Sequence, residues 1–406
     1  RLAEKAGDFD TLVRILEQRA SARGGAERLE AMVRAAEIYE DHLNDIAEAS
    51  RRFEAVLATD PKNMNALRGL DRIYNRTGKY RELLDTLERQ VQAAATPRQK
   101  MGLYERIAAL HDEEFLDHQG AIDALGKVLA LDPTNDGALS GLVRHYRATD
   151  RWDRVVETLE QHVAVATEPS RKSELLLGKA RVLAEQIGSP ERAMKAYEAV
   201  LSLTPGHAGA LEALAQLREV TGDSHAALSA IEALASKAET PEARAEQWMR
   251  AGRLLETRGD KDGAITRYTR ALEAKPGDAA ASSALRKAYR ERGDAGSVVT
   301  LIEQELKGTD VDLQKARLFA ELALLYKSEL KQNDNAESAA KKAIELDPSS
   351  ADALLVLGDL AYESGRFLDA VKILESLVGR VQVLPSKDDG TRVLVRYVES
   401  FGKTQI

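Results

Sequence analysis

The sequence predicts an all-α protein in which antiparallel helix pairs stack along the chain as an α-solenoid. Of its 406 residues, 44% are hydrophobic and 31% are charged, while only 5% are aromatic. The core must therefore be built mainly from alanine and aliphatic side chains, a composition typical of helical proteins. Three series of marker residues also recur with a period of about 72 residues, which indicates a repeat architecture rather than separate globular domains.

The markers identify where helices end. A proline recurs once in each period, at Pro61, Pro133, Pro205, Pro276 and Pro348. A constant interval separates each proline from an alanine before it, at Ala49, Ala121, Ala193, Ala264 and Ala336. A second constant interval separates each proline from the turn sequence after it, which begins at Gly78, Asp150, Gly222, Gly293 and Gly365. Proline cannot continue a helix interior and glycine adopts a positive φ without cost, so both residues punctuate helices.

Each unit of about 72 residues divides into two helix–turn–helix halves. Leu67, Leu70 and Tyr74 lie on one helical face before Gly78, and Leu83 opens the next apolar stripe. One half is about 34 residues long, and it alternates with a version about four residues longer. We expect the extra turn at Pro97, Pro169 and Pro241, where a longer helix joins the next pair.

These residues resemble the tetratricopeptide repeat signature. The best match is Trp248-x2-Ala251-Gly252-x2-Leu255, followed by Ala264-x3-Tyr268-x2-Ala271 and Pro276. Weaker matches suggest a long, degenerate array of the bacterial type, with ten repeats beginning near residues 30, 64, 102, 136, 174, 208, 245, 279, 317 and 351. The resemblance implies a right-handed superhelix of antiparallel helix pairs. It also implies a concave face, lined mainly by the first helix of each repeat, that holds peptides or partner helices.

The repeats predict one uninterrupted solenoid over residues 25–384. Residues 1–24 are expected to be the end of a truncated repeat, with Leu2 and Ala3 where a first helix finishes. After a looser connection at 381–390, residues 385–406 are expected to contribute the first helix of an incomplete repeat. Solenoids usually close with polar-faced caps, and neither end has one. We therefore expect a fragment of a longer array that can self-associate end to end.

Composition excludes several function classes. The absence of cysteine rules out disulfides and thiolate metal sites, although it leaves the compartment open. A cytoplasmic location is the first expectation, and a periplasmic one is the alternative because a signal could precede Arg1. The net charge of −8 disfavours a nucleic-acid surface, and the lack of a long apolar run excludes a predicted membrane span.

No motif for catalysis or cofactor binding is evident. Phosphate-binding and dinucleotide-binding glycine motifs are absent, as is His-Glu-x2-His. We therefore expect neither an enzyme nor a cofactor. The most metal-like cluster is His111, Asp112, Glu113, Glu114, Asp117 and His118. A solvated helix end explains this cluster better than a metal does, so no metal site is expected.

A discontinuous basic strip is the candidate partner-binding site. Its members recur at matching places in first helices and are Arg68, Arg72, Asn75, Arg144, Arg147, Lys287 and Arg290. Such a strip could pair carboxylates bidentately. Acidic residues at matching places elsewhere are Glu212, Glu219, Asp352, Asp359 and Glu363. The alternative is a solvated, mixed-sign helix face. The strip predicts that Arg72→Glu with Arg144→Glu weakens partner binding without lowering helicity.

The function favoured by the sequence is a non-catalytic scaffold that presents a groove to protein or peptide partners. The alternative is a substrate-docking or regulatory arm of a larger enzyme whose catalytic domain lies outside this chain. A helical repeat that binds nucleic acid is disfavoured by the acidic balance.

Overall fold

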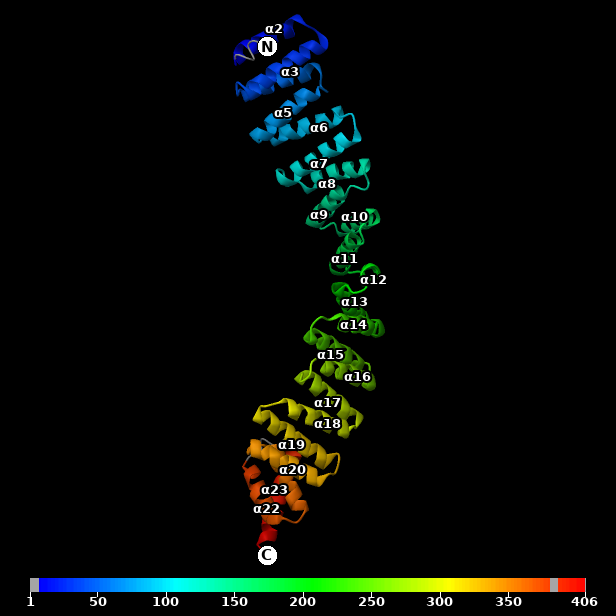
Figure 1. Cartoon of the computed structure of the whole chain (residues 1–406), viewed down its shortest axis with the longest axis vertical. Coiled ribbons are helices and arrows are strands. Elements are labelled where there is room, and N and C mark those ends of the chain that lie inside the picture. Colours follow the sequence, from blue (N-terminus) through cyan, green and yellow to red (C-terminus); the bar gives the residue numbers. More distant parts are fainter. Residues whose placement is uncertain (1–6, 380–385, 406) are drawn as a thin grey trace. The chain divides into compact units, whose positions relative to one another are not determined.

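The computed structural model describes residues 7–379 and 386–405, which form twenty-two α-helices and no strands (Figure 1). The all-α fold predicted from the repeats is thereby confirmed. Contacts divide the chain into two compact units, residues 1–210 and 211–406, and each is described by itself. We call the odd-numbered helices from α3 onward first helices, and the even-numbered helices second helices.

The first unit contains α2 (Phe9–Ala22), α3 (Gly25–Asp41), α4 (Ile46–Thr59), α5 (Met64–Thr77), α6 (Tyr80–Ala93), α7 (Pro97–Glu113), α8 (His118–Leu131), α9 (Asp136–Ala148), α10 (Trp152–Val165), α11 (Pro169–Glu185) and α12 (Pro190–Leu203). α13 (Ala208–Thr221) begins in this unit and ends in the second. The second unit continues with α14 (Ser224–Lys237), α15 (Pro241–Thr257), α16 (Lys261–Ala274), α17 (Ala279–Arg292), α18 (Ala295–Gly308), α19 (Asp312–Ser328), α20 (Asn333–Leu346), α21 (Ala351–Glu363), α22 (Phe367–Val378) and α23 (Lys387–Thr404).

Local chemistry sets the helix boundaries. The side chain of Asn63 caps α5 by accepting from the Ala66 N–H, and α5 ends at Gly78, which has a φ of 66°. Pro97 occupies the first turn of α7, where a missing N–H costs nothing. Pro169 and Pro241 do the same for α11 and α15, and all three helices are 17 residues long. The extra turn predicted at these prolines is present.

Small residues allow the two helices of a repeat to pack closely. The marker alanines are completely or almost completely buried. Gly252 in α15 faces the ring of Tyr268 in α16, so that a Cβ at this position would overlap the ring. Tyr268 is 1% exposed and donates a hydrogen bond to Glu256 at 2.7 Å. Each helix contacts the next from α2 to α12 in the first unit and from α14 to α23 in the second, which is how the apolar stripes become buried.

The C-terminal boundary differs from the prediction. α23 already begins at Lys387, because Ser386 caps it by accepting from the Asp389 N–H at 3.1 Å. The expected looser connection through Gly390 is therefore wrong for residues 387–390, which are helical, and its part at 381–385 lies outside the described residues. Leu2 and Ala3 also lie outside them. None of the described helices has the length and apolarity needed to cross a membrane.

Candidate functional site

Four members of the predicted basic strip form ion pairs between successive first helices. Arg72 donates two hydrogen bonds to Glu40, at 3.2 and 2.7 Å. Arg144 reaches Asp112 at 2.6 Å, Lys287 reaches Glu256 at 2.6 Å, and Arg290 pairs with Glu321. The hydrogen bond to Glu40 raises the pKa of Arg72 even though partial burial opposes the shift. These cations therefore already have protein carboxylates as partners.

The pairs belong to a longer series, which we call the inter-repeat ladder. It consists of Glu40–Arg72, Asp71–Arg106, Asp112–Arg144, Glu219–Arg250, Glu256–Lys287, Arg290–Glu321, Lys327–Asp359 and Asp359–Arg396. Every pair joins a first helix to the next first helix in the chain. The ladder therefore neutralises charge along this face and holds adjacent repeats in register.

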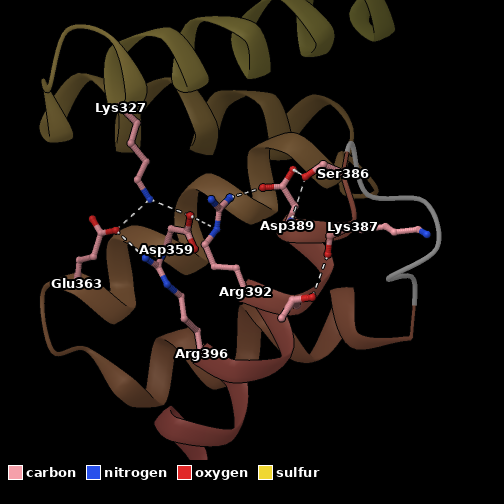
Figure 2. Close-up of polar contacts among 9 residues, drawn as sticks. Lys327, Asp359, Glu363, Ser386, Lys387, Asp389, Arg392 and Arg396 are labelled. Carbon is pink, nitrogen blue, oxygen red and sulfur yellow. Dashed lines mark hydrogen bonds and ion pairs between the residues drawn. The ribbon is translucent and has the colours of Figure 1, made fainter.

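In the Lys327–Asp359 pair the basic residue precedes the acidic one, which reverses the order found in Glu40–Arg72 (Figure 2). Here the acids lie on the middle helix: Asp359 and Glu363 of α21 point toward Lys327 of α19 and Arg396 of α23. Lys327 lies 3.0 Å from Asp359, which is 4% exposed. The acidic positions predicted at Asp359 and Glu363, like Glu212 and Glu219 opposite Arg250, thus form one half of ion pairs.

Asp71 is the most completely satisfied acid of the ladder. It accepts two hydrogen bonds from Arg106, at 2.7 and 2.6 Å, and one from Gln90 at 3.0 Å. Burial alone would raise the pKa of Asp71, but the hydrogen bonds from Arg106 and Gln90 outweigh burial and lower it. This carboxylate is consequently held ionised inside the repeat interface.

The ladder is interrupted at Gly178. Arg106, Arg250 and Glu321 are each the tenth residue of a 17-residue first helix, and Gly178 occupies that place in α11. Arg147 stands in α9 where Arg290 stands in α17, yet it has no ion pair with any described residue. Its guanidinium lies 3.7 Å from the position that a Cβ of Gly178 would take. Arg147 therefore lies beside a glycine at the position where Glu321 pairs with Arg290.

A pocket of about 640 Å³ opens at this interruption. Its apolar wall includes Trp152 and Leu159 of α10 together with Leu175, Leu177 and Val182 of α11. Its charged groups are Arg147, Arg171, Arg181, Glu174 and Glu185. Arg171 lies 3.4 Å from Glu174, whereas Arg147 and Arg181 lack a carboxylate partner in the described part of the chain. The pocket thus joins an aromatic and aliphatic wall to two unpaired guanidinium groups.

Lys287 and Arg290 line a second, smaller pocket of about 480 Å³. Its walls are mostly charged, and Glu256 and Glu321 already neutralise these two cations. The remaining strip members, Arg68 and Asn75, are exposed on α5, and their side chains form no hydrogen bond or ion pair within the described ranges. Of the seven predicted residues, Arg147 is therefore the one that lines a pocket and has no ion-pair partner among the described residues.

The predicted metal-like cluster separates in the structure. His111 pairs with Asp117 at 3.0 Å, and Asp117 caps α8 through the N–H groups of Gln119 and Gly120. Asp112 and His118 instead face His145 of α9, which the sequence had not linked to them.

The pocket residues Trp152, Arg171 and Arg181 were not predicted, although a signal for them was available. Arg106, Gly178 and Arg250 are separated by one period each, and glycine replaces arginine only at the middle position. A comparison of the units at this position would have indicated the interruption.

The comparisons agree with this architecture. Three family profiles, each described as tetratricopeptide repeat, match the chain. One matches residues 66–101, a second matches 116–176 and 329–383, and the third matches 212–279 and 249–296. The chain is a tetratricopeptide repeat protein. The family resemblance inferred from the sequence is confirmed. No curated protein matches the sequence significantly.

Solved structures with this fold share little sequence with the chain. The matched chain in the structure of Naa15/Naa10 bound to HypK-THB is 14% identical to this chain, with a TM-score of 0.39. The match covers 97% of this chain and 66% of the Naa15/Naa10 chain, so this chain spans just under two thirds of that relative's length. YrrB, described as having an unusual peptide-binding site, is 18% identical, with a TM-score of 0.31 and coverage of 47% and 90%. A tetratricopeptide repeat protein from Parabacteroides merdae is 18% identical, with a TM-score of 0.29 and coverage of 64% and 98%.

Proposed function

We propose that this chain is a non-catalytic interaction module, and that the pocket between α9 and α11 binds a peptide segment carrying a carboxylate next to apolar side chains. The observation that carries the proposal is Arg147 facing Gly178, without the acidic partner that its counterpart Arg290 has. Arg181 lies on the same pocket and is also unpaired among the described residues. Two unpaired guanidinium groups are suited to capture a carboxylate in bidentate geometry.

The apolar wall supports a peptide rather than a free carboxylate ion. Trp152, Leu159 and Leu175 supply a surface against which leucine-sized side chains can be buried, and a tryptophan beside arginine is typical of binding hot spots. Because Glu174 and Glu185 lie at the same pocket, a ligand rich in acid but lacking apolar groups would be partly repelled. The favoured ligand therefore combines both features.

Peptide selection on the whole chain tests this function. A displayed random-peptide library should yield sequences in which Asp or Glu lies beside Leu, Ile or Phe. The critical variant is Gly178→Glu, which places a carboxylate opposite Arg147 as Glu321 is placed opposite Arg290. Loss of one charge-assisted contact, about 1.5–3 kcal/mol, should weaken a selected peptide about tenfold or more in fluorescence anisotropy.

The controls separate binding from folding. Arg181→Ala should also weaken binding, while Arg68→Ala, at an exposed arginine outside the pocket, should leave it unchanged. The far-ultraviolet circular dichroism of Gly178→Glu should match the unsubstituted chain, since a Cβ at this position makes only an ordinary van der Waals contact with Arg147. Selected peptides without acidic residues, or peptides that bind Gly178→Glu as tightly as the unsubstituted chain, would contradict the proposal.

A further inference from the structure

We propose that Asp112, His118 and His145 bind a single divalent transition-metal ion, with zinc the best match to the donor atoms. The three residues come from α7, α8 and α9, so the site would join both helices of one repeat to the first helix of the next. One ligand atom from each residue lies within 4.8 Å of the other two. This site differs from the sequence expectation, which grouped Asp112 and His118 with other residues and placed no metal there.

The imidazole geometry fits a tetrahedral ion. The Nδ1 atoms of His118 and His145 are 3.2 Å apart. Two nitrogen ligands on a tetrahedral zinc ion, with bonds of about 2.0–2.1 Å, are separated by about 3.3 Å. The Oδ1 atom of Asp112 lies 3.8 Å from the Nδ1 atom of His145, so a small rotation of the carboxylate brings it to the same separation. Two imidazoles and one carboxylate leave a fourth position for water.

Zinc binding at Nδ1 requires the tautomer of His145 that has its proton on Nε2, so Arg144, which lies 3.4 Å from Nε2, must then donate to Asp112 alone. His145 is 1% exposed, so water competes little for its ring nitrogens. A neutral imidazole is the form that coordinates metal. Arg144 donates to Oδ2 of Asp112 at 2.6 Å and leaves Oδ1 available, which is the outer contact that orients many ligating carboxylates.

A simple hydrogen bond between two neutral histidines is the competing explanation for the short contact. It needs no ion and predicts no metal uptake. The two explanations also predict different melting temperatures, because an ion that bridges three helices binds the folded chain more tightly than the unfolded chain and so raises the melting temperature.

Zinc binding to the whole chain decides between them. After treatment with EDTA and removal of the chelator, isothermal titration with ZnCl₂ should show one ion bound per chain. The test variant is His118→Ala, because His118 is only half-buried whereas replacing the buried His145 would disturb packing. Its zinc affinity should fall by at least about tenfold, since loss of even an outer-sphere partner typically costs that much. His225→Ala, at an exposed histidine of α14, should bind zinc unchanged.

Thermal unfolding followed by circular dichroism provides the second measurement. Zinc should raise the melting temperature of the unsubstituted chain and of His225→Ala, but not of His118→Ala. Absence of saturable zinc uptake by the unsubstituted chain would overturn the proposal, and so would equal affinity in His118→Ala. Either result would leave the contact as a histidine–histidine hydrogen bond.

Discussion

Replacing Arg106 with alanine should loosen the interface between α5 and α7 far more than removing an exposed cation of the same ladder. Arg106 supplies two of the three hydrogen bonds received by Asp71, which is 8% exposed. Without Arg106 the buried carboxylate keeps only Gln90 as a partner. An unpaired buried charge is costly, and the substitution converts a satisfied acid into one.

The expected magnitude follows from burial. Breaking a fully buried pair costs about 3–5 kcal/mol. The Arg106 side chain is 47% exposed, so water can reach part of the vacated space, and we expect about 2 kcal/mol. Lys287→Ala is the matched control, because Lys287 is 63% exposed and pairs with Glu256 at the surface. Its effect should be clearly smaller, since water and salt screen an exposed pair.

Hydrogen exchange followed by mass spectrometry is the appropriate assay, because repeat arrays open locally and do not unfold in one step. In Arg106→Ala, the amides of α5 and α7 should exchange about 30-fold faster, which corresponds to about 2 kcal/mol. A double-mutant cycle with Asp71→Ala should recover most of this cost as coupling energy. Equal effects of Arg106→Ala and Lys287→Ala would refute the view that burial, and not pairing alone, sets the strength of the ladder.

Two further predictions concern the turns and the pH dependence. Leu116 is 78% exposed and has a φ of 52°, so Leu116→Gly should stabilise the α7–α8 pair by about 0.5–1 kcal/mol, as measured by hydrogen exchange of its amides. Gly188→Leu at the equivalent turn should destabilise the α11–α12 pair by a similar amount, and the same sign for both substitutions would contradict this reasoning. Arg366, and secondly Lys341, lower the pKa of Glu337 from 4.5 to about 2, so the stabilisation is complete above pH 4.5 and lost as the pH falls toward 2. Because Arg366 is 44% exposed, Glu337→Gln should cost only about 1 kcal/mol at pH 7, as measured by hydrogen exchange in α20. The cost should become small as the pH approaches 2, and a cost that does not depend on pH would exclude the ion pair as its source.

The helices were predictable because their signals are local. Gly78 ends α5 through its positive φ, and Pro97 starts α7 because its fixed φ and missing N–H suit a first turn. Neither signal depends on what the helix packs against. The helical periodicity of the core then follows from spacings of three and four residues. The boundary at Ser386 was missed because its capping role is decided by a single side-chain contact.

The ion-pair partners were not predicted, because each one lies on a different repeat, far from its partner in the sequence. Arg72 looks like a free surface cation in the sequence, but Glu40 neutralises it. The substitution Arg72→Glu would set a second carboxylate against Glu40, which is 5% exposed, and would strain the repeat interface. Weaker partner binding in that variant could therefore not be assigned to a lost contact, which is why Gly178→Glu is the better test.

The sequence nevertheless contained a pairing signal. Glu40, Asp112 and Glu256 recur at one position of the long first helices, and their partners Arg72, Arg144 and Lys287 recur at one position of the short ones. The next members of the two series are Lys327 and Asp359, where both signs change together. A joint reversal of this kind preserves attraction, so it indicates contact between the two positions even without a structure.

The fluorescence of Trp152 tests the binding pocket most directly. The chain has two tryptophans, so Trp248→Phe leaves Trp152, which lines the pocket between α9 and α11, as the sole reporter. Titration with a selected acidic, apolar peptide should shift or quench its emission with the affinity found by anisotropy, and Gly178→Glu should weaken that response about tenfold or more. Peptide binding that leaves the emission of Trp152 unchanged would place the partner elsewhere and contradict the proposed site.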